Sequence, residues 1–141
     1  MSVMYILFFG FILITSLLIA LAEIQIEGAG GWARDLPTWR KKLKLGPWQF
    51  ELTGYHLFFF SALFLMLHFR FVFQPFTLKD ELITIAAYLF MTILEDFFWF
   101  LCNPAYGLKK YDREHVYWFS SWFLGFPALY FFGLPLRVIL L

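Results

Sequence analysis

Residues 78–102 read LKDELITIAAYLFMTILEDFFWFLC, and this stretch decides the class of the protein. After a polar first turn it stays apolar for long enough to cross a bilayer, which takes about 20 residues of helix. Two carboxylates, Glu95 and Asp96, interrupt it near its carboxyl end. Such groups cost roughly 2.5–3.5 kcal/mol each on insertion scales and usually belong to a functional or paired interior site. We therefore expect a membrane helix that carries a polar site.

The composition of the whole chain agrees with a membrane protein. Of its 141 residues, 62% are hydrophobic and 15% are charged, whereas a soluble domain is about 45–50% apolar and about 25% charged. This excludes a soluble globular enzyme and a disordered chain. A net charge of +1 argues against nucleic acid as a partner, because that needs a concentrated basic surface. The single cysteine, Cys102, excludes an intrachain disulfide and a multi-cysteine metal centre.

Three further apolar stretches are predicted to cross the membrane: about residues 4–22, 52–73 and 113–134. Backbone groups in lipid must be satisfied within the segment, so we expect helices. With residues 78–102 they predict an all-α integral membrane protein, a four-transmembrane-helix bundle in one domain over residues 1–141. Thr77 and Asp112 are expected to cap the third and fourth helices. The first stretch resembles a signal peptide but has no basic residue before it, so we expect a retained helix.

The loop between the first two predicted helices, about residues 23–51, is too long for a plain connection in a bundle, so we expect it to be structured. Asp35 would cap a short helix that runs to Lys44 and ends at Gly46-Pro47. Three apolar residues fall on one side of this helix: Leu36, Trp39 and Leu43. Basic residues cover much of the rest, which predicts an amphipathic helix lying in the interface and attracting anionic lipid.

Lysine and arginine residues predict the orientation of the chain. Eight of them lie in the first and third loops: Arg34, Arg40, Lys41, Lys42, Lys44, Lys109, Lys110 and Arg113. Three fall on the other side: Arg70, Lys79 and Arg137. We therefore expect loops one and three in the cytoplasm and both termini outside, in the plasma membrane of a prokaryote.

The polar residues gather at the predicted cytoplasmic face. Glu95 and Asp96 lie about 9 Å from the end of their span, and His56 lies about 6 Å inside the second span. Because these helices are antiparallel, His56, Glu95 and Asp96 fall at similar depth, and we expect them to be the catalytic residues. All six tryptophans belong to the same face: Trp32, Trp39, Trp48, Trp99, Trp118 and Trp122.

Three interpretations of this polar group stay open. The first is a buried ion-pair network in which Arg34 and Arg40 bind Glu95 or Asp96. The second is an acid–base pair or a single divalent metal ion, held by four ligands: His56, Glu95, Asp112 and His115. Glu23 or Glu27 could complete such a shell. The third is transport, which would need an oligomer because four short helices make a poor pore.

The function expected from these residues is a shallow carboxylate and histidine pocket at the cytoplasmic face. It would bind a membrane lipid headgroup or a small ligand, with or without a metal, for membrane-bound chemistry. Arg34, Arg40 and Trp99 are the expected ligand-binding residues. The alternatives are a non-catalytic membrane subunit packed against a larger complex, and an oligomeric ion or proton transporter. The sequence leaves open whether the chain is an enzyme and whether it forms a homo-oligomer.

Overall fold

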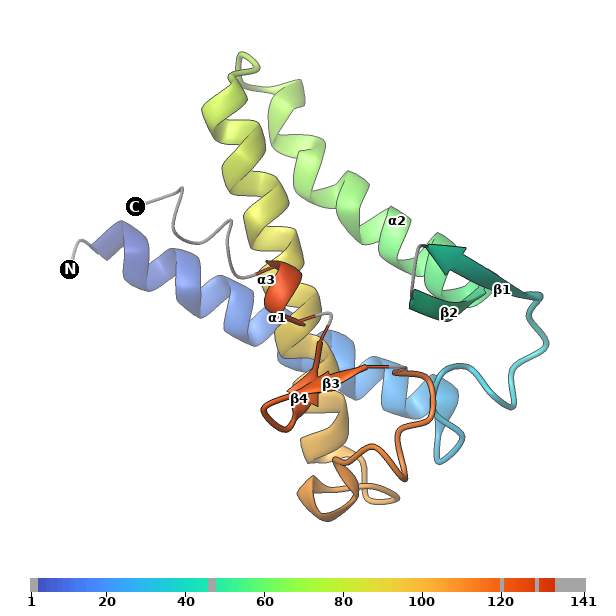
Figure 1. Ribbon diagram of the computed structural model, residues 1–141. Coiled ribbons are helices and arrows are strands. Elements are labelled where there is room, and N and C mark those ends of the chain that lie inside the picture. The colour runs from blue at the N-terminus through green and yellow to red at the C-terminus, as the bar shows by residue number, and fades with distance from the viewer. Residues whose placement is uncertain (1–2, 46–47, 120, 129, 134–141) are drawn as a thin grey trace.

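Three long helices dominate the computed structural model, which describes residues 3–45, 48–119, 121–128 and 130–133 (Figure 1). They are α1 (Val3–Glu27), α2 (Gly54–His68) and α3 (Leu78–Cys102). A 3-10 turn, η1 (Phe69–Val72), extends α2. Each helix, with η1 counted in the second, is long and apolar enough to cross a membrane. The prediction of a mostly helical chain with helices that could span a membrane is therefore confirmed.

The helix ends follow local chemistry. The Thr77 hydroxyl caps α3 as predicted and accepts a hydrogen bond from the amide of Asp80 at 3.0 Å. Thr53 caps α2 in the same way and accepts from the amide of His56 at 3.2 Å. The first helix continues beyond the predicted end at residue 22, so Glu23 and Glu27 lie on α1.

The loop after α1 is structured, but the predicted amphipathic helix is wrong. Strand β1 (Arg40–Leu45) pairs antiparallel with β2 (Trp48–Thr53), and residues 36–39 form a bend followed by irregular backbone. The sequence from Leu43 to Leu52 alternates apolar and polar residues on both sides of a two-residue Gly-Pro connection. This alternation is typical of a hairpin, and it extends over more residues than the helical spacing of Leu36, Trp39 and Leu43. The Gly46-Pro47 pair lies outside the described residues.

The predicted fourth membrane helix is also wrong. In the described residues 113–119 and 121–128 the chain makes turns and a small antiparallel pair, β3 (Trp122–Phe123) with β4 (Phe126–Pro127). Two short helices flank this segment: η2 (Leu108–Lys110) and α4 (Tyr130–Gly133). Gly125 has a φ of +81°, and Pro127 has no amide hydrogen to donate, so neither favours a continuous helix here. Asp112 caps a single turn, in which its carboxylate accepts hydrogen bonds from the amides of Glu114 and His115 at 2.9 Å. No helix follows this turn in the described residues 113–119.

The described residues therefore hold three candidate spans instead of four. The prediction that both termini lie outside required an even number of spans, because only then do the two ends of the chain lie on the same side. Three candidate spans no longer support it. The last residue of the predicted fourth helix, Leu134, and the cation Arg137 lie outside the described residues.

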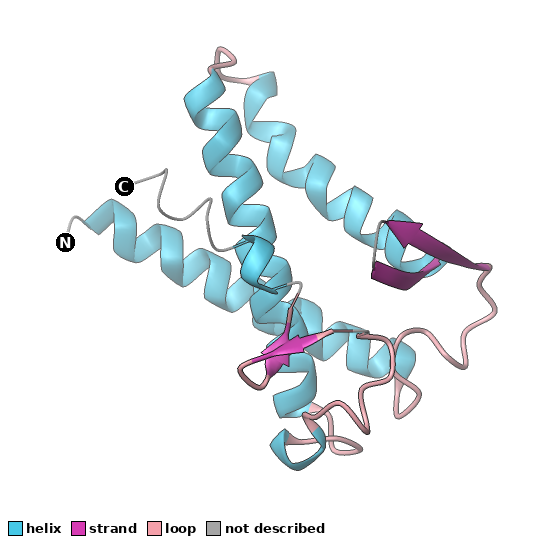
Figure 2. Cartoon of the chain, viewed as in Figure 1, coloured by secondary structure: helices cyan, strands magenta, loops and turns pink. Residues whose placement is uncertain are grey.

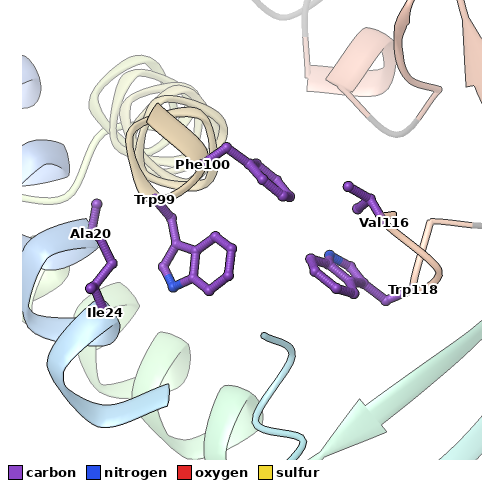
Figure 3. Packing of buried hydrophobic residues seen from close by; sticks show 6 residues of the cluster. All are labelled: Ala20, Ile24, Trp99, Phe100, Val116 and Trp118. Atoms are coloured by element: carbon purple, nitrogen blue, oxygen red, sulfur yellow. The ribbon is translucent and has the colours of Figure 1, made fainter. Parts of the chain in front are cut away.

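Helix α3 packs mainly against α1, while α2 joins α3 at their short turn and spreads away from it, so that the start of α2 comes near the end of α1 (Figures 1 and 2). In the middle of the α1–α3 contact the buried Ser16 hydroxyl donates to the carbonyl of Met91 at 3.0 Å. Ile12 and Ile19 pack beside it. A second core joins the ends of α1 and α3 to residues 116–118. Figure 3 shows its six members: Ala20, Ile24, Trp99, Phe100, Val116 and Trp118.

The outward faces of α1 and α2 are strongly apolar. Large side chains are exposed along them: Ile6, Leu7, Phe11, Ile14, Leu18, Phe58, Leu65 and Met66. An apolar surface of this extent is unusual on a soluble monomer and is the normal surface of a helix in lipid.

Removal of the Ser16 hydroxyl should loosen the α1–α3 contact. For Ser16→Ala we expect a loss of about 0.6 kcal/mol, and at most about 1.7 kcal/mol, as for other hydrogen bonds between membrane helices. The measurement is reversible unfolding of the detergent-solubilised protein. Ser61→Ala, at an exposed position of α2, is the matched control and should leave the free energy of unfolding unchanged. An equal loss in both variants would contradict the assigned contact.

Candidate functional site

A cavity of about 40 Å³ lies where the ends of the three spans meet. Its walls come from α1, α2, α3 and two loop segments. Nine residues line it: Glu23, Glu27, Trp32, His56, Phe60, Glu95, Asp96, Trp99 and Trp118. The structure thus brings together His56, Glu95, Asp96 and Trp99, all of which the sequence analysis placed in one pocket. Their catalytic and binding roles stay predictions.

Glu27 and His56 contact each other at this cavity. Glu27 Oε1 lies 3.3 Å from His56 Nε2 and accepts a hydrogen bond of 2.5 Å from the amide of Ala33. On the other side of the ring, His56 Nδ1 lies 2.6 Å from the Thr53 hydroxyl oxygen. The imidazole therefore lies between a carboxylate beside Nε2 and a hydroxyl group beside Nδ1. These contacts on both nitrogens fix the orientation of the imidazole ring.

The loop above His56 carries backbone strain. Trp32 and Ala33 have φ values of +50° and +52°, which cost of order 1–3 kcal/mol each for residues other than glycine. Arg40 helps to hold this conformation by donating to the carbonyls of both residues, and the Trp32 indole donates to the Glu51 carbonyl at 2.9 Å. As a result the Trp32 ring stacks on His56 with a centroid separation of 4.2 Å. Strain of this kind is concentrated at functional sites.

The two predicted arginines do not line the cavity. Arg40 pairs with Glu51 at 2.9 Å, and the Arg34 side chain is exposed. Among the described residues neither arginine forms an ion pair with Glu95 or Asp96, so the predicted network does not form. A role for Arg34 and Arg40 in binding a ligand stays a prediction.

Several polar atoms at the cavity are buried without a hydrogen-bonding partner among the described residues. They are Glu23 Oε1, Glu95 Oε1, Asp96 Oδ2 and Trp99 Nε1. More than nine in ten buried polar groups in proteins are paired, and an unpaired one costs about 1–3 kcal/mol. Four carboxyl groups and one imidazole line the cavity, and within the described part of the chain no lysine or arginine does. Protons or a bound cation must therefore balance this charge.

The predicted metal ligands separate into two places. His56 and Glu95 lie at the cavity, but Asp112 and His115 are partly exposed and bind each other, with His115 Nδ1 2.8 Å from Asp112 Oδ1. This hydrogen bond lowers the pKa of the Asp112 carboxyl group. The described structure does not bring the four predicted ligands together at one site. Across residues 3–45, 48–119, 121–128 and 130–133, no three His, Cys, Asp or Glu side chains converge to hold a metal ion.

Three indole rings complete the walls. The Trp32 and Trp118 rings are nearly parallel at 6.3 Å, and Trp99 lies edge-on to Trp118 at 6.2 Å. The negative faces of aromatic rings attract cations, and tryptophan does so most strongly. Carboxylates and indoles around one small space therefore favour a positively charged occupant.

Three lining residues were absent from the predicted site: Trp32, Phe60 and Trp118. Glu23 and Glu27 were predicted only as alternatives that could complete a metal shell. The spacing of Glu23 and Glu27 places both on one side of a helix, which is a usable signal once α1 is extended to residue 27. Trp118 carried no comparable signal, because its position depends on the fold of the segment after α3.

Comparison with known proteins identifies no family. No protein-family model matches the chain, and no curated protein or solved structure matches it.

Gly31 fits a position where a side chain is not tolerated. Its φ is +60°, and an added Cβ would lie 2.8 Å from the Trp118 ring. We expect Gly31→Ala to cost at least about 1–2 kcal/mol and to displace Trp118 from the cavity. Unfolding in detergent and tryptophan fluorescence measure the two effects.

Gly10→Ala is the matched control for this prediction. Gly10 lies within α1, and no atom lies within 4 Å of its added Cβ. This variant should be neutral or gain up to about 1 kcal/mol. If Gly31→Ala behaved like Gly10→Ala, the described loop conformation would be wrong.

Proposed function

We propose that this integral membrane protein binds a small cationic group in the cavity at the ends of its three spans. The group is the ammonium of a soluble amine or of a lipid headgroup. One observation carries the proposal: the described lining combines four carboxyl groups and three indoles with no lysine or arginine. A cation there would satisfy the unpaired oxygens of Glu23, Glu95 and Asp96.

Two attractions act together on such a group. The carboxylates provide charge-assisted hydrogen bonds to N–H donors, which are roughly twice as strong as neutral ones. The indole faces provide cation–π attraction, worth about 2 kcal/mol or more when the cation is desolvated. Both are stronger where water is excluded, as at this buried site.

The size of the cavity limits the ligand. A water molecule needs about 10–15 Å³ of such space, so 40 Å³ holds about three waters. Sites for drug-sized ligands occupy about 300–1,000 Å³. An ammonium group fits, whereas a complete lipid headgroup with its phosphate would have to remain partly outside.

The orientation of His56 favours a second function, acid–base chemistry at the bound group. Its imidazole is held on both nitrogens, by Glu27 and Thr53, and is covered by a strained Trp32. Such a ring can take up a proton at Nδ1, where the Thr53 hydroxyl oxygen can accept from it, while the Glu27 carboxylate beside Nε2 balances the charge. Nitrogen-15 NMR of the His56 ring should show its protonation change when methylamine binds. A ring whose protonation stays constant throughout binding would contradict this second function.

We infer that the cavity faces the cytoplasm. The Asn103 amide donates to the Gly28 carbonyl at 2.9 Å, so the segments after α1 and α3 meet at the cavity end. These segments carry eight basic residues, and the opposite α2–α3 turn region carries Arg70 and Lys79. The excess of basic residues supports a cytoplasmic location for the richer side.

Cation binding can be tested on the purified protein in phosphatidylcholine nanodiscs. Tryptophan fluorescence should change saturably with methylammonium and not with methanol. Glu95→Gln and Asp96→Asn should each weaken binding about tenfold or more, which corresponds to about 1.4 kcal/mol. Protons compete for the same carboxylates, so binding should weaken as the pH falls. The control Glu114→Gln changes an exposed carboxylate and should have no effect.

Two nanodisc compositions distinguish the sources of the ammonium. If the ligand is a lipid headgroup, phosphatidylethanolamine in the nanodisc should weaken methylammonium binding by competition. If it is a soluble amine, the two compositions should give equal affinity. Absence of saturable binding, or full binding in both cavity variants, would contradict the proposal.

A further inference from the structure

A second, larger hollow lies between the turn before β1 and the start of α2. This groove has a volume of about 480 Å³ and shares no residue with the cavity. Seven residues line it: Pro37, Thr38, Trp39, Gly54, Tyr55, Phe58 and Phe59. Four of them are aromatic, and Trp39 and Phe58 are 42% and 68% exposed. Its volume falls within the usual range for ligand sites.

The groove is built by specific contacts. The Thr38 hydroxyl accepts from the amide of Tyr55 at 2.8 Å, and the amide of Gly54 donates to the Trp39 carbonyl at 2.9 Å. The Trp39 indole lies directly over Gly54, where an added Cβ would come within 2.5 Å of the ring nitrogen. Trp39 is therefore held as one wall at the membrane-surface end of α2.

The neighbouring hairpin is amphipathic. Lys41, Leu43, Phe50 and Leu52 share one face, since Lys41 pairs with Leu52 and Leu43 with Phe50 in the register. Leu43 and Phe50 are 38% and 41% exposed. The opposite face carries Arg40, Lys42, Lys44 and Glu51. Such a ribbon fits the membrane interface, with its apolar face towards the lipid.

Lys41 places a cation beside Trp39, one of the residues that line the groove. It belongs to the apolar face, and its Nζ lies 5.7 Å from the centroid of the Trp39 ring. Lys42, the next residue, points to the other face, where its strand partner is Glu51. The groove thus has mostly aromatic walls, and the Lys41 ammonium group lies next to one of them, Trp39.

We propose that this groove binds one anionic phospholipid of the surrounding bilayer, with an acyl chain against Trp39 and Phe58 and the phosphate at Lys41. Charge complementarity identifies the occupant, because an apolar groove with a cation beside Trp39 matches a lipid that carries a net negative charge. The proposal does not depend on cation binding in the cavity. The two sites have opposite charge preference and separate linings.

Native mass spectrometry of the protein from nanodiscs with equal phosphatidylglycerol and phosphatidylcholine tests this site. The wild type should retain phosphatidylglycerol several-fold over phosphatidylcholine. Lys41→Gln should bring the ratio close to one, and Lys41→Arg should restore it. Lys42→Gln is the matched control on the opposite face and should keep the preference.

A substitution at Phe58 tests the apolar wall of the groove. Phe58→Ala should reduce the retention of both lipids, because it removes acyl contact without changing charge. Equal loss of preference in Lys41→Gln and Lys42→Gln would show diffuse electrostatic attraction and overturn the site. A wild type with no preference, or unchanged retention in Phe58→Ala, would overturn it as well.

Discussion

The structure depends on the burial of four carboxyl groups beside one imidazole at the end of three membrane spans. Glu23 and Glu27 come from α1, and Glu95 and Asp96 come from α3, so these helices must lie close together at this end. The Ser16 hydrogen bond and the Ala20–Trp99 packing fix that approach. A cluster of carboxyl groups is stable in the membrane only if protons or a cation neutralise it. The close packing of α1 and α3 at this end therefore depends on what occupies the cavity.

Glu27 connects the helices to the rest of the site. Its carboxylate holds the strained backbone at Ala33 and also approaches His56, so loop conformation and imidazole orientation depend on one side chain. Trp118 covers the cavity from a segment far along the chain. The aromatic residues therefore both exclude water and present their faces to a cation, which explains their concentration at one end of the molecule.

The three spans and the grouping of His56, Glu95 and Asp96 were predictable because apolar length and the cost of charge in lipid are local properties. Other features depend on competition between patterns. To predict the hairpin, the alternation of apolar and polar residues from Leu43 to Leu52 has to be given more weight than the helical spacing of Leu36, Trp39 and Leu43. In the segment after α3, hydrophobicity favoured a span, whereas Gly125 and Pro127 favoured turns. The pairing of Arg40 with Glu51 follows from the strand register, which the helical prediction excluded.

The most direct test of the account is to count the protons that leave the cavity when a cation enters. Infrared difference spectroscopy of the protein in phosphatidylcholine nanodiscs, with and without methylammonium, reports the protonated carboxyl band, and a pH indicator counts the released protons. If a cation displaces protons from the cavity, methylammonium should reduce this band and release protons, and Glu95→Gln should diminish both signals. Binding of methylammonium with no change in the carboxyl band, or an unaltered signal in Glu95→Gln, would contradict it.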